Sequence, residues 1–107
     1  MKQTVVITGA SRGIGRAVAL AFAEKSASKN NQEEYNIFVN CAKNSELLEN
    51  VKKQIRDLGV CCESFTGDIS DYNTAMEMFD EVHRHFGNVD ILVNNAGISM
   101  IGLFQDM

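Results

Sequence analysis

The chain has 107 residues and a mass of 11.8 kDa, which suits one small domain and is too short for two. Hydrophobic residues make up 45% of the chain and charged residues 22%, which excludes wholesale disorder. The net charge of −4 argues against nucleic-acid binding, which draws on clustered Lys and Arg. No apolar run reaches the ~20 residues of a membrane-spanning helix and no signal peptide is visible, so we expect a cytoplasmic protein with no membrane partner.

The three cysteines, Cys41, Cys61 and Cys62, are odd in number and form no Cys-x-x-Cys pair. This pattern argues against both a disulfide framework and a zinc site. We therefore expect all three to be small buried residues in strands. No other spacing of potential ligands predicts a metal site.

Short β-branched runs alternate with longer amphipathic stretches along the chain. The runs predict strands at residues 3–8, 35–41, 60–66 and 89–94. Between them, apolar residues recur at helical spacing and predict three helices. Their stripes are Ile14, Ala17, Val18, Ala21 and Phe22 in a helix over residues 13–27; Leu47, Leu48, Val51, Ile55 and Leu58 in the second; and Ala75, Phe79, Val82 and Phe86 in the third.

Capping residues delimit the second and third helices. Ser45 is the expected N-cap of the second helix and Gly59 its end. Ser70 or Asp71 caps the third helix, which ends at Gly87. Strands joined by helix-length connections indicate an open α/β sheet with parallel pairing and right-handed crossovers. Residues 26–34 are polar and longer than the usual ~2–6-residue loop, and we expect a mobile surface insertion without a functional role there.

Residues 8–15, Thr-Gly-Ala-Ser-Arg-Gly-Ile-Gly, lie between the first strand and the first helix. Gly9 permits a sharp turn, Gly13 a close approach of backbone to a ligand, and Gly15 close packing of helix on sheet. The positive end of the helix dipole then points at the same place, which suits a pyrophosphate. The Gly-Lys-Ser/Thr ending of a Walker A loop is missing. The alternative is a glycine-rich turn that binds nothing.

Three motifs in order resemble the short-chain dehydrogenase/reductase family. Residues 8–15 match its TGxxxGxG motif, residues 94–97 its NNAG motif, and Asp68 its adenine-contacting acid. Residues 97–107 further resemble the bacterial 3-oxoacyl-[acyl-carrier-protein] reductase-like branch. The resemblance implies a Rossmann-type doubly wound parallel sheet, of which the chain would hold the first four strands and three helices. Residues 1–107 would then be a single incomplete NAD(P)-binding domain, the N-terminal part of a longer reductase.

The resemblance also implies a set of cofactor contacts. The Asp68 carboxylate would accept from the adenine amino group, with the Ile69 backbone N–H facing a ring nitrogen. Asn94 would tie the sheet together. The alternatives are a turn residue before the Ser70 cap for Asp68 and turn amides for the two asparagines. The implied cofactor-binding residues are Gly9, Ser11, Arg12, Gly13, Ile14, Gly15, Lys43, Asp68 and Ile69, with Asn95, Ala96 and Gly97 lining the nicotinamide-side ribose.

The end of the second strand predicts which dinucleotide is preferred. An acid there accepts hydrogen bonds from the ribose 2′-OH of NAD and repels a 2′-phosphate. The resemblance would place that acid at the position of Ala42, which Lys43 follows, while Arg12 lies in the glycine loop. Two cations without a carboxylate favour NADP(H) over NAD(H). The alternative is that Arg12 and Lys43 are solvated surface charges.

No catalytic residue is identified in the chain. The family uses a Tyr-x-x-x-Lys pair with an upstream Ser, whereas Tyr35 is followed at the fourth position by Val39 and Tyr72 by Met76. The helix histidines, His83 and His85, are expected to be solvated. The chain alone is therefore predicted to be inactive.

The intact protein is predicted to be an NADPH-dependent reductase that transfers hydride to a carbonyl substrate, with a 3-oxoacyl thioester as one candidate. The resemblance implies a homo-oligomer when complete. A sheet ending at the fourth strand would leave residues 91–93 with an unpaired apolar edge, which also predicts a longer protein. The alternatives are a stand-alone, non-catalytic nucleotide-binding or interaction module and a structural domain that binds nothing.

Overall fold

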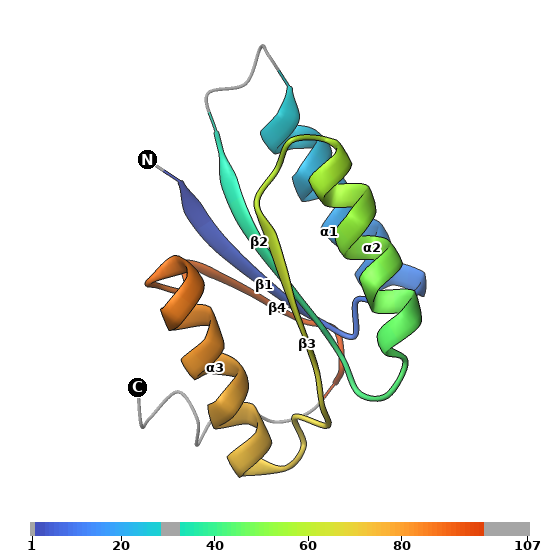
Figure 1. Ribbon diagram of the computed structural model, residues 1–107, viewed down its shortest axis with the longest axis vertical. Helices are drawn as coiled ribbons and strands as arrows, with labels where there is room; N and C mark the ends of the chain where they lie inside the picture. The colour runs from blue at the N-terminus through green and yellow to red at the C-terminus, as the bar shows by residue number, and fades with distance from the viewer. Residues whose placement is uncertain (1, 29–32, 98–107) are drawn as a thin grey trace.

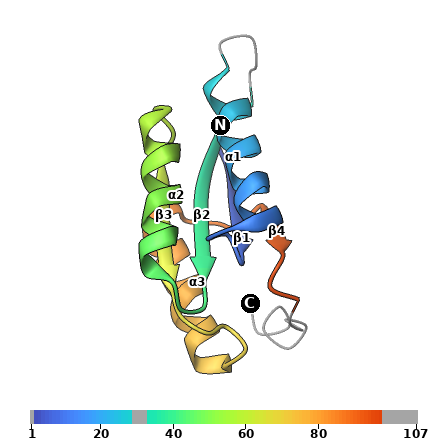
Figure 2. The same cartoon turned by 90° about the vertical axis from the view of Figure 1, so that its right-hand side faces the viewer.

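The computed structural model describes residues 2–28 and 33–97. Four parallel strands form one sheet in the order β3-β2-β1-β4, with α1 and α2 on one face and α3 on the other (Figures 1 and 2). The predicted α/β fold is confirmed. The elements are β1 (Gln3–Thr8), α1 (Gly13–Ala27), β2 (Tyr35–Cys41), α2 (Ser45–Asp57), β3 (Cys62–Thr66), α3 (Tyr72–Phe86) and β4 (Ile91–Asn94).

Parts of two sequence predictions lie outside the described residues. They are the centre of the polar segment 26–34, residues 29–32, and nearly all of the stretch 97–107 that resembles one reductase branch. Within the described residues, no helix is both long enough and apolar enough to cross a membrane.

The central strands are apolar on both sides because the sheet is covered on both faces. Val5 and Ile7 of β1 pack into the core beneath α1 and α2, whereas Val6 between them packs with α3. In β2, Val39 and Phe38 are divided between the two cores in the same way. Alternate side chains of a strand point to opposite faces, so a continuous apolar run is what a doubly covered parallel sheet requires.

Parallel pairing brings the carboxyl ends of all four strands to one edge of the sheet. Thr8 pairs in register with Asn94, and Cys41 with Thr66. The chain runs outward from β1 through β2 to β3, and then crosses to the far side of β1 to add β4. The strand order therefore reverses beside β1, and ligands of open α/β sheets bind at such a switch point. β4 pairs only with β1 among the described strands, and Ile91, Leu92 and Val93 are half-buried.

The most deeply buried residues of helix α1 are small, and two members of its apolar stripe, Val18 and Phe22, pack beside them while half-buried. Its buried residues are Gly15, Ala19 and Ala23, whereas Ile14 is 75% exposed. Small residues allow the helix axis to come close to the strands, and the larger Val18, Leu20 and Phe22 then pack at the sides of this contact. The periodicity predicted the helix correctly, with the bounds Gly13–Ala27.

Two predicted strands are shorter than expected, because β3 begins at Cys62 and β4 at Ile91. Cys41 and Cys62 are buried as predicted, and burial raises the pKa of the Cys62 thiol to about 12. The prediction for Cys61 is wrong, since this residue lies just before β3 and is exposed. Side chains alternate along an extended segment, so the neighbour of the buried Cys62 points away from the core.

The predicted helix ends are confirmed except for one cap. Gly59 and Gly87 have φ angles of 82° and 88°, the left-handed conformation that commonly ends a helix. Asp71, one of the two predicted caps, accepts a hydrogen bond from the Thr74 backbone N–H at 3.1 Å. Helix α2 is capped by Asn44 and not by Ser45. The Asn44 side-chain oxygen accepts from the Leu47 backbone N–H at 3.1 Å.

We expect Asn44→Ala to lower the free energy of unfolding by about 1 kcal/mol, because the Leu47 N–H loses its acceptor at the start of α2. Urea denaturation followed by circular dichroism measures this loss. Ser45→Ala is the matched control and should change stability by less than about 0.5 kcal/mol. Equal losses in the two variants would contradict the assignment of the cap.

Candidate functional site

The turn between β1 and α1 adopts a conformation that favours glycine at two positions. Gly9 has a φ angle of 62° and Gly13 one of 61°, both in the left-handed region. Side chains other than glycine are strained there, so these glycines set the path of the loop. No described atom lies within 4 Å of the place where a Cβ on Gly13 would stand. The outer side of the loop is therefore open to a ligand.

The first turn of α1 touches the loop backbone directly at Gly15. A Cβ on Gly15 would lie 2.1 Å from the Gly9 carbonyl oxygen and 2.7 Å from Nδ2 of Asn95. Nδ2 of Asn95 also donates a hydrogen bond to that same carbonyl, at 3.1 Å. The close packing predicted for Gly15 is present, and it holds the β1 turn, the start of α1 and the β4 turn together.

The amino end of α1 is left available to an anion. Its N-cap residue, Arg12, is extended, and in the described part of the chain no side chain caps the first turn. That turn also contains no acidic residue. The first backbone N–H groups of a helix lack partners within the helix and lie at the positive end of its dipole. A phosphate group fits this arrangement.

A cleft of 360 Å³ opens between the glycine loop and the end of β2. Arg12 and Lys43, which are 31 residues apart in sequence, both line it. Among the described residues that form the cleft there is no carboxylate. The strand-ending positions Cys41 and Ala42 are both uncharged. The full lining is Ser11, Arg12, Cys41, Ala42, Lys43, Asn44 and Leu47.

Asp68 lies in the exposed turn that follows β3. Its Oδ1 accepts hydrogen bonds from the Ser70 hydroxyl at 2.6 Å and from the Ser70 backbone N–H at 3.0 Å. These two bonds, the hydroxyl first, hold the pKa of Asp68 below its ordinary value, and the nearby charge of Lys43 acts in the same direction. Asp68 is thus a turn residue and also an ionised acceptor close to the cleft. Ile69 is buried in the core on the α3 side.

The turn after β4 is fastened to β1 by a hydroxyl group. Thr8 Oγ1 donates to Oδ1 of Asn94 at 3.2 Å and accepts from the Ala96 backbone N–H at 3.0 Å. Asn94 therefore joins β4 to β1, in the role the resemblance implied for it. Ala96 and Gly97 are exposed beside the glycine loop. Their contact with a ribose stays a prediction.

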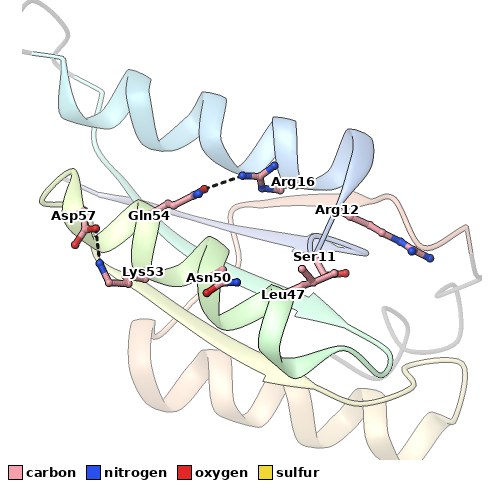
Figure 3. Close-up of a pocket in the computed structure, with 8 residues that line it drawn as sticks. All are labelled: Ser11, Arg12, Arg16, Leu47, Asn50, Lys53, Gln54 and Asp57. Atoms are coloured by element: carbon pink, nitrogen blue, oxygen red, sulfur yellow. Dashed lines mark hydrogen bonds and ion pairs between the residues drawn. The ribbon is translucent and has the colours of Figure 1, made fainter.

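A second cleft of 480 Å³ adjoins the first along the groove between α1 and α2 (Figure 3). Arg16 extends across this groove, where its Nη2 donates to Oε1 of Gln54 at 3.3 Å. Lys53 forms an ion pair with Asp57 at 3.0 Å in the same groove. The two clefts share Ser11, Arg12 and Leu47, but Arg16 lines only the second. Arg16 is a cation near the site that the sequence motifs did not single out.

Two polar residues that connect the loops were also missed. Thr8 was assigned to the first strand and the glycine motif, and Asn40 only to a strand. Both are buried, with exposed fractions of 0% and 1%. A polar residue within an apolar strand is itself a signal, because a buried polar group requires hydrogen-bond partners. The sequence does not say where those partners lie.

The described residues contain no catalytic pair of the kind the family uses. Tyr35 begins β2, at the edge of the sheet opposite the clefts, and its hydroxyl donates to Oε2 of Glu33 at 2.5 Å. This hydrogen bond raises the pKa of Tyr35. His83 and His85 are exposed on α3, as predicted. Within the described residues, no three His, Cys, Asp or Glu side chains are grouped as metal ligands.

Comparison with known proteins agrees with this geometry. The family described as "short chain dehydrogenase" matches residues 3–107. The chain belongs to the short-chain dehydrogenase family. The resemblance seen in the glycine loop, in Asp68 and in residues 94–97 is thereby confirmed at the level of the family.

Named short-chain dehydrogenase relatives extend well beyond this chain. The chain is 39% identical over 107 residues to the 3-oxoacyl-[acyl-carrier-protein] reductase FabG of Staphylococcus aureus and spans 40% of its length. It is 34% identical to the sepiapterin reductase of Chlorobaculum tepidum and spans 43% of it.

Solved structures show the same arrangement of strands and helices. The NADPH-dependent reductase YwfH, involved in bacilysin biosynthesis, has a TM-score of 0.73 at 29% identity, over 87% of this chain and 36% of that one. The acetoin dehydrogenase YohF of Salmonella typhimurium has a TM-score of 0.74 at 25% identity, over 90% of this chain and 36% of that one.

We expect Gly15→Ala to lower the free energy of unfolding by more than about 2 kcal/mol, because the new methyl group meets the Gly9 carbonyl. The better helix propensity of alanine, about 1 kcal/mol, offsets only part of this loss. Gly13→Ala is the control, since it shares the loop but meets no described atom. It should cost about 1 kcal/mol of backbone strain. Urea denaturation of both variants measures the difference, and a Gly15→Ala variant as stable as the parent would contradict the close packing.

We expect the pKa of the Asp68 carboxyl to lie below its ordinary value, and Ser70→Ala to raise that pKa because it removes the hydroxyl donor. Carbon-13 NMR of the carboxyl group measures both pKa values. A depressed native pKa contributes stability above the unfolded pKa, and this stability is lost as the pH falls through the native pKa. Lys43→Ala should raise the pKa less than Ser70→Ala does. The reverse order would show that the charge of Lys43 dominates the shift and would contradict this assignment.

Proposed function

We propose that this chain is the NADP(H)-binding half of a short-chain oxidoreductase. The observation that carries the proposal is the cleft lined by Arg12 and Lys43 and by no described carboxylate. A phosphate on the adenosine 2′ position is a compact dianion. Arg binds such a group through two parallel N–H donors, and Lys adds a point charge. A carboxylate at this place would repel that phosphate. A described cleft lining without a carboxylate therefore favours NADP(H) over NAD(H).

The remaining loops fit the rest of the dinucleotide. The uncapped start of α1, with Gly13 open to the outside, suits the pyrophosphate. Asp68 is an ionised acceptor that would receive the adenine amino group, with the Ile69 N–H beside it. Asn95, Ala96 and Gly97 would line the ribose on the nicotinamide side. The bound cofactor would supply a hydride, while this chain's own residues bind and orient it.

We propose further that the intact protein reduces a carbonyl group. Residues 1–107 would be the N-terminal part of its Rossmann domain, and the Tyr-x-x-x-Lys pair would lie outside them. Similarity to FabG, whose name specifies a 3-oxoacyl-[acyl-carrier-protein] substrate, favours a 3-oxoacyl thioester. Similarity to YwfH, an NADPH-dependent reductase, supports NADPH as the reductant. The proposal assigns the chemical step to the intact protein and cofactor binding to this chain.

We expect NADPH to bind more tightly than NADH, and Arg12→Ala to weaken NADPH by at least about tenfold through loss of a charged hydrogen-bonding group. Lys43→Ala should act in the same direction. NADH affinity should change little in either variant. The ratio of the NADH dissociation constant to the NADPH dissociation constant should therefore fall towards one. Isothermal titration calorimetry of the intact protein at constant salt measures this ratio.

Arg16→Ala is the matched control for this experiment. It removes an arginine one turn further along α1 that lines only the adjoining groove. In this variant the ratio of the NADH and NADPH dissociation constants should stay within about twofold of the parent value. An unchanged ratio in Arg12→Ala and Lys43→Ala would contradict the proposed preference. Failure of the parent protein to bind either dinucleotide would contradict nucleotide binding altogether.

A further inference from the structure

Asn40 is a buried amide near the end of β2, between the apolar Val39 and Cys41. Its exposed fraction is 1%, and its side chain points toward the backbone at the end of β3 and just beyond it. Nδ2 lies 3.1 Å from the Phe65 carbonyl oxygen and 3.3 Å from that of Gly67. It also lies 3.3 Å from the carbonyl oxygen of Cys41. An amide nitrogen carries two hydrogens, so three carbonyl oxygens share two donors.

The partners of Asn40 lie where strand pairing stops. The register between β2 and β3 ends at Cys41 and Thr66, so the Gly67 carbonyl lies beyond the last pair. The Asn40 amide supplies a donor at that point. The Gly67 backbone N–H in turn donates to the Cys41 carbonyl at 2.9 Å. These bonds fix the direction in which the chain leaves β3, one residue before Asp68.

The main chain of Asn40 reaches the opposite wall of the candidate site. Its carbonyl oxygen accepts from the Ala10 backbone N–H at 2.8 Å. Ala10 lies inside the glycine loop, and its exposed fraction is 0%. One residue thus bonds to the glycine loop through its backbone and to the turn before Asp68 through its side chain. An aliphatic residue at position 40 would keep the first bond and lose the second set.

We propose that Asn40 is a positioning residue that holds the turn of Asp68 at a fixed distance from the glycine loop. One nucleotide, an adenosine with a 2′-phosphate, can then contact the turn and the loop at the same time. This inference rests on the proposed function. The adenosine group would contact Arg12 and Lys43 on one side and Asp68 on the other. Because Asn40 is buried, it acts through the loops and does not touch the ligand. It therefore sets affinity for the adenosine half of the cofactor.

The test compares Asn40→Ala with Asn36→Ala in the intact protein. Asn36 lies in the same strand at the other end and is half-buried. The probe is adenosine carrying phosphates at its 2′ and 5′ positions, titrated calorimetrically beside NADPH. We expect Asn40→Ala to weaken both ligands by about tenfold, after correction for the folded fraction. Asn36→Ala should bind both ligands as the parent does.

Amide hydrogen exchange gives a second readout that does not depend on a ligand. Asn40→Ala should speed exchange of the Gly67 N–H relative to Asn36→Ala, because the turn loses its donor. If Asn40→Ala does not fold, Asn40→Ser keeps one donor and should show both effects at smaller size. Those effects in the serine variant support the inference, and parent-like values overturn it.

The outcomes separate the two proposals. Parent-like affinity for the adenosine bisphosphate in a folded Asn40→Ala protein overturns the positioning role and leaves the proposed function in place. A purely structural role would lower the free energy of unfolding while leaving the affinity of the folded protein unchanged, which also overturns the inference. Failure of the parent protein to bind NADPH or the probe overturns the proposed function and the inference together, before any substitution is made.

Discussion

The approach of α1 to the turn after β1 is the contact on which the candidate site depends. A Cβ on Gly15 would stand 2.1 Å from the Gly9 carbonyl oxygen, so only glycine allows the helix to begin there. Because α1 begins so close to the sheet, its unpaired N–H groups face the carboxyl edge of the strands. The Asn95 amide bonds to the same carbonyl and adds the β4 turn to this arrangement. The shape of the site therefore depends on backbone packing, and the charged side chains project from that packed backbone.

Local charge outweighs net charge in this molecule. The chain carries a net charge of −4, yet the cleft beside β2 contains Arg12 and Lys43 and no described carboxylate. At physiological salt, exposed charges are screened over a distance of about 8 Å. A phosphate in the cleft would therefore respond mainly to the two cations that line it. Asp68 is a carboxylate close enough to respond to the charge of Lys43, and it already accepts two hydrogen bonds from Ser70. An acidic protein can in this way hold a site suited to an anion.

Most of the fold could be predicted from the sequence because its signals are local. Valine and isoleucine runs marked the strands, and Gly59 and Gly87 marked where helices end. Such local signals do not say which side of an element faces the core. The α1 stripe gave the correct helix, but its member Ile14 is exposed, because close packing places the small Gly15, Ala19 and Ala23 at the centre of the buried face. The prediction for Cys61 failed for this reason, since neighbouring side chains of an extended segment point to opposite sides and Cys62 is the buried one.

The residues of the candidate site fall into two groups. A sequence motif identifies the first group, whereas the roles of the second group depend on tertiary contacts. Glycines and cations could be identified from the sequence, because each residue type has few reasons to stand in such a loop. The roles of Thr8 and Asn40 could not, since their partners lie as many as 88 and 27 residues away. Those two buried groups connect the loops, whereas Arg12 and Lys43 are exposed on them. Exposed cations can change with little cost to packing, while a buried amide or hydroxyl cannot lose its partners cheaply. The buried residues that shape the site are therefore different from the exposed cations to which the proposed dinucleotide preference is assigned, and those cations can vary while the shape is kept.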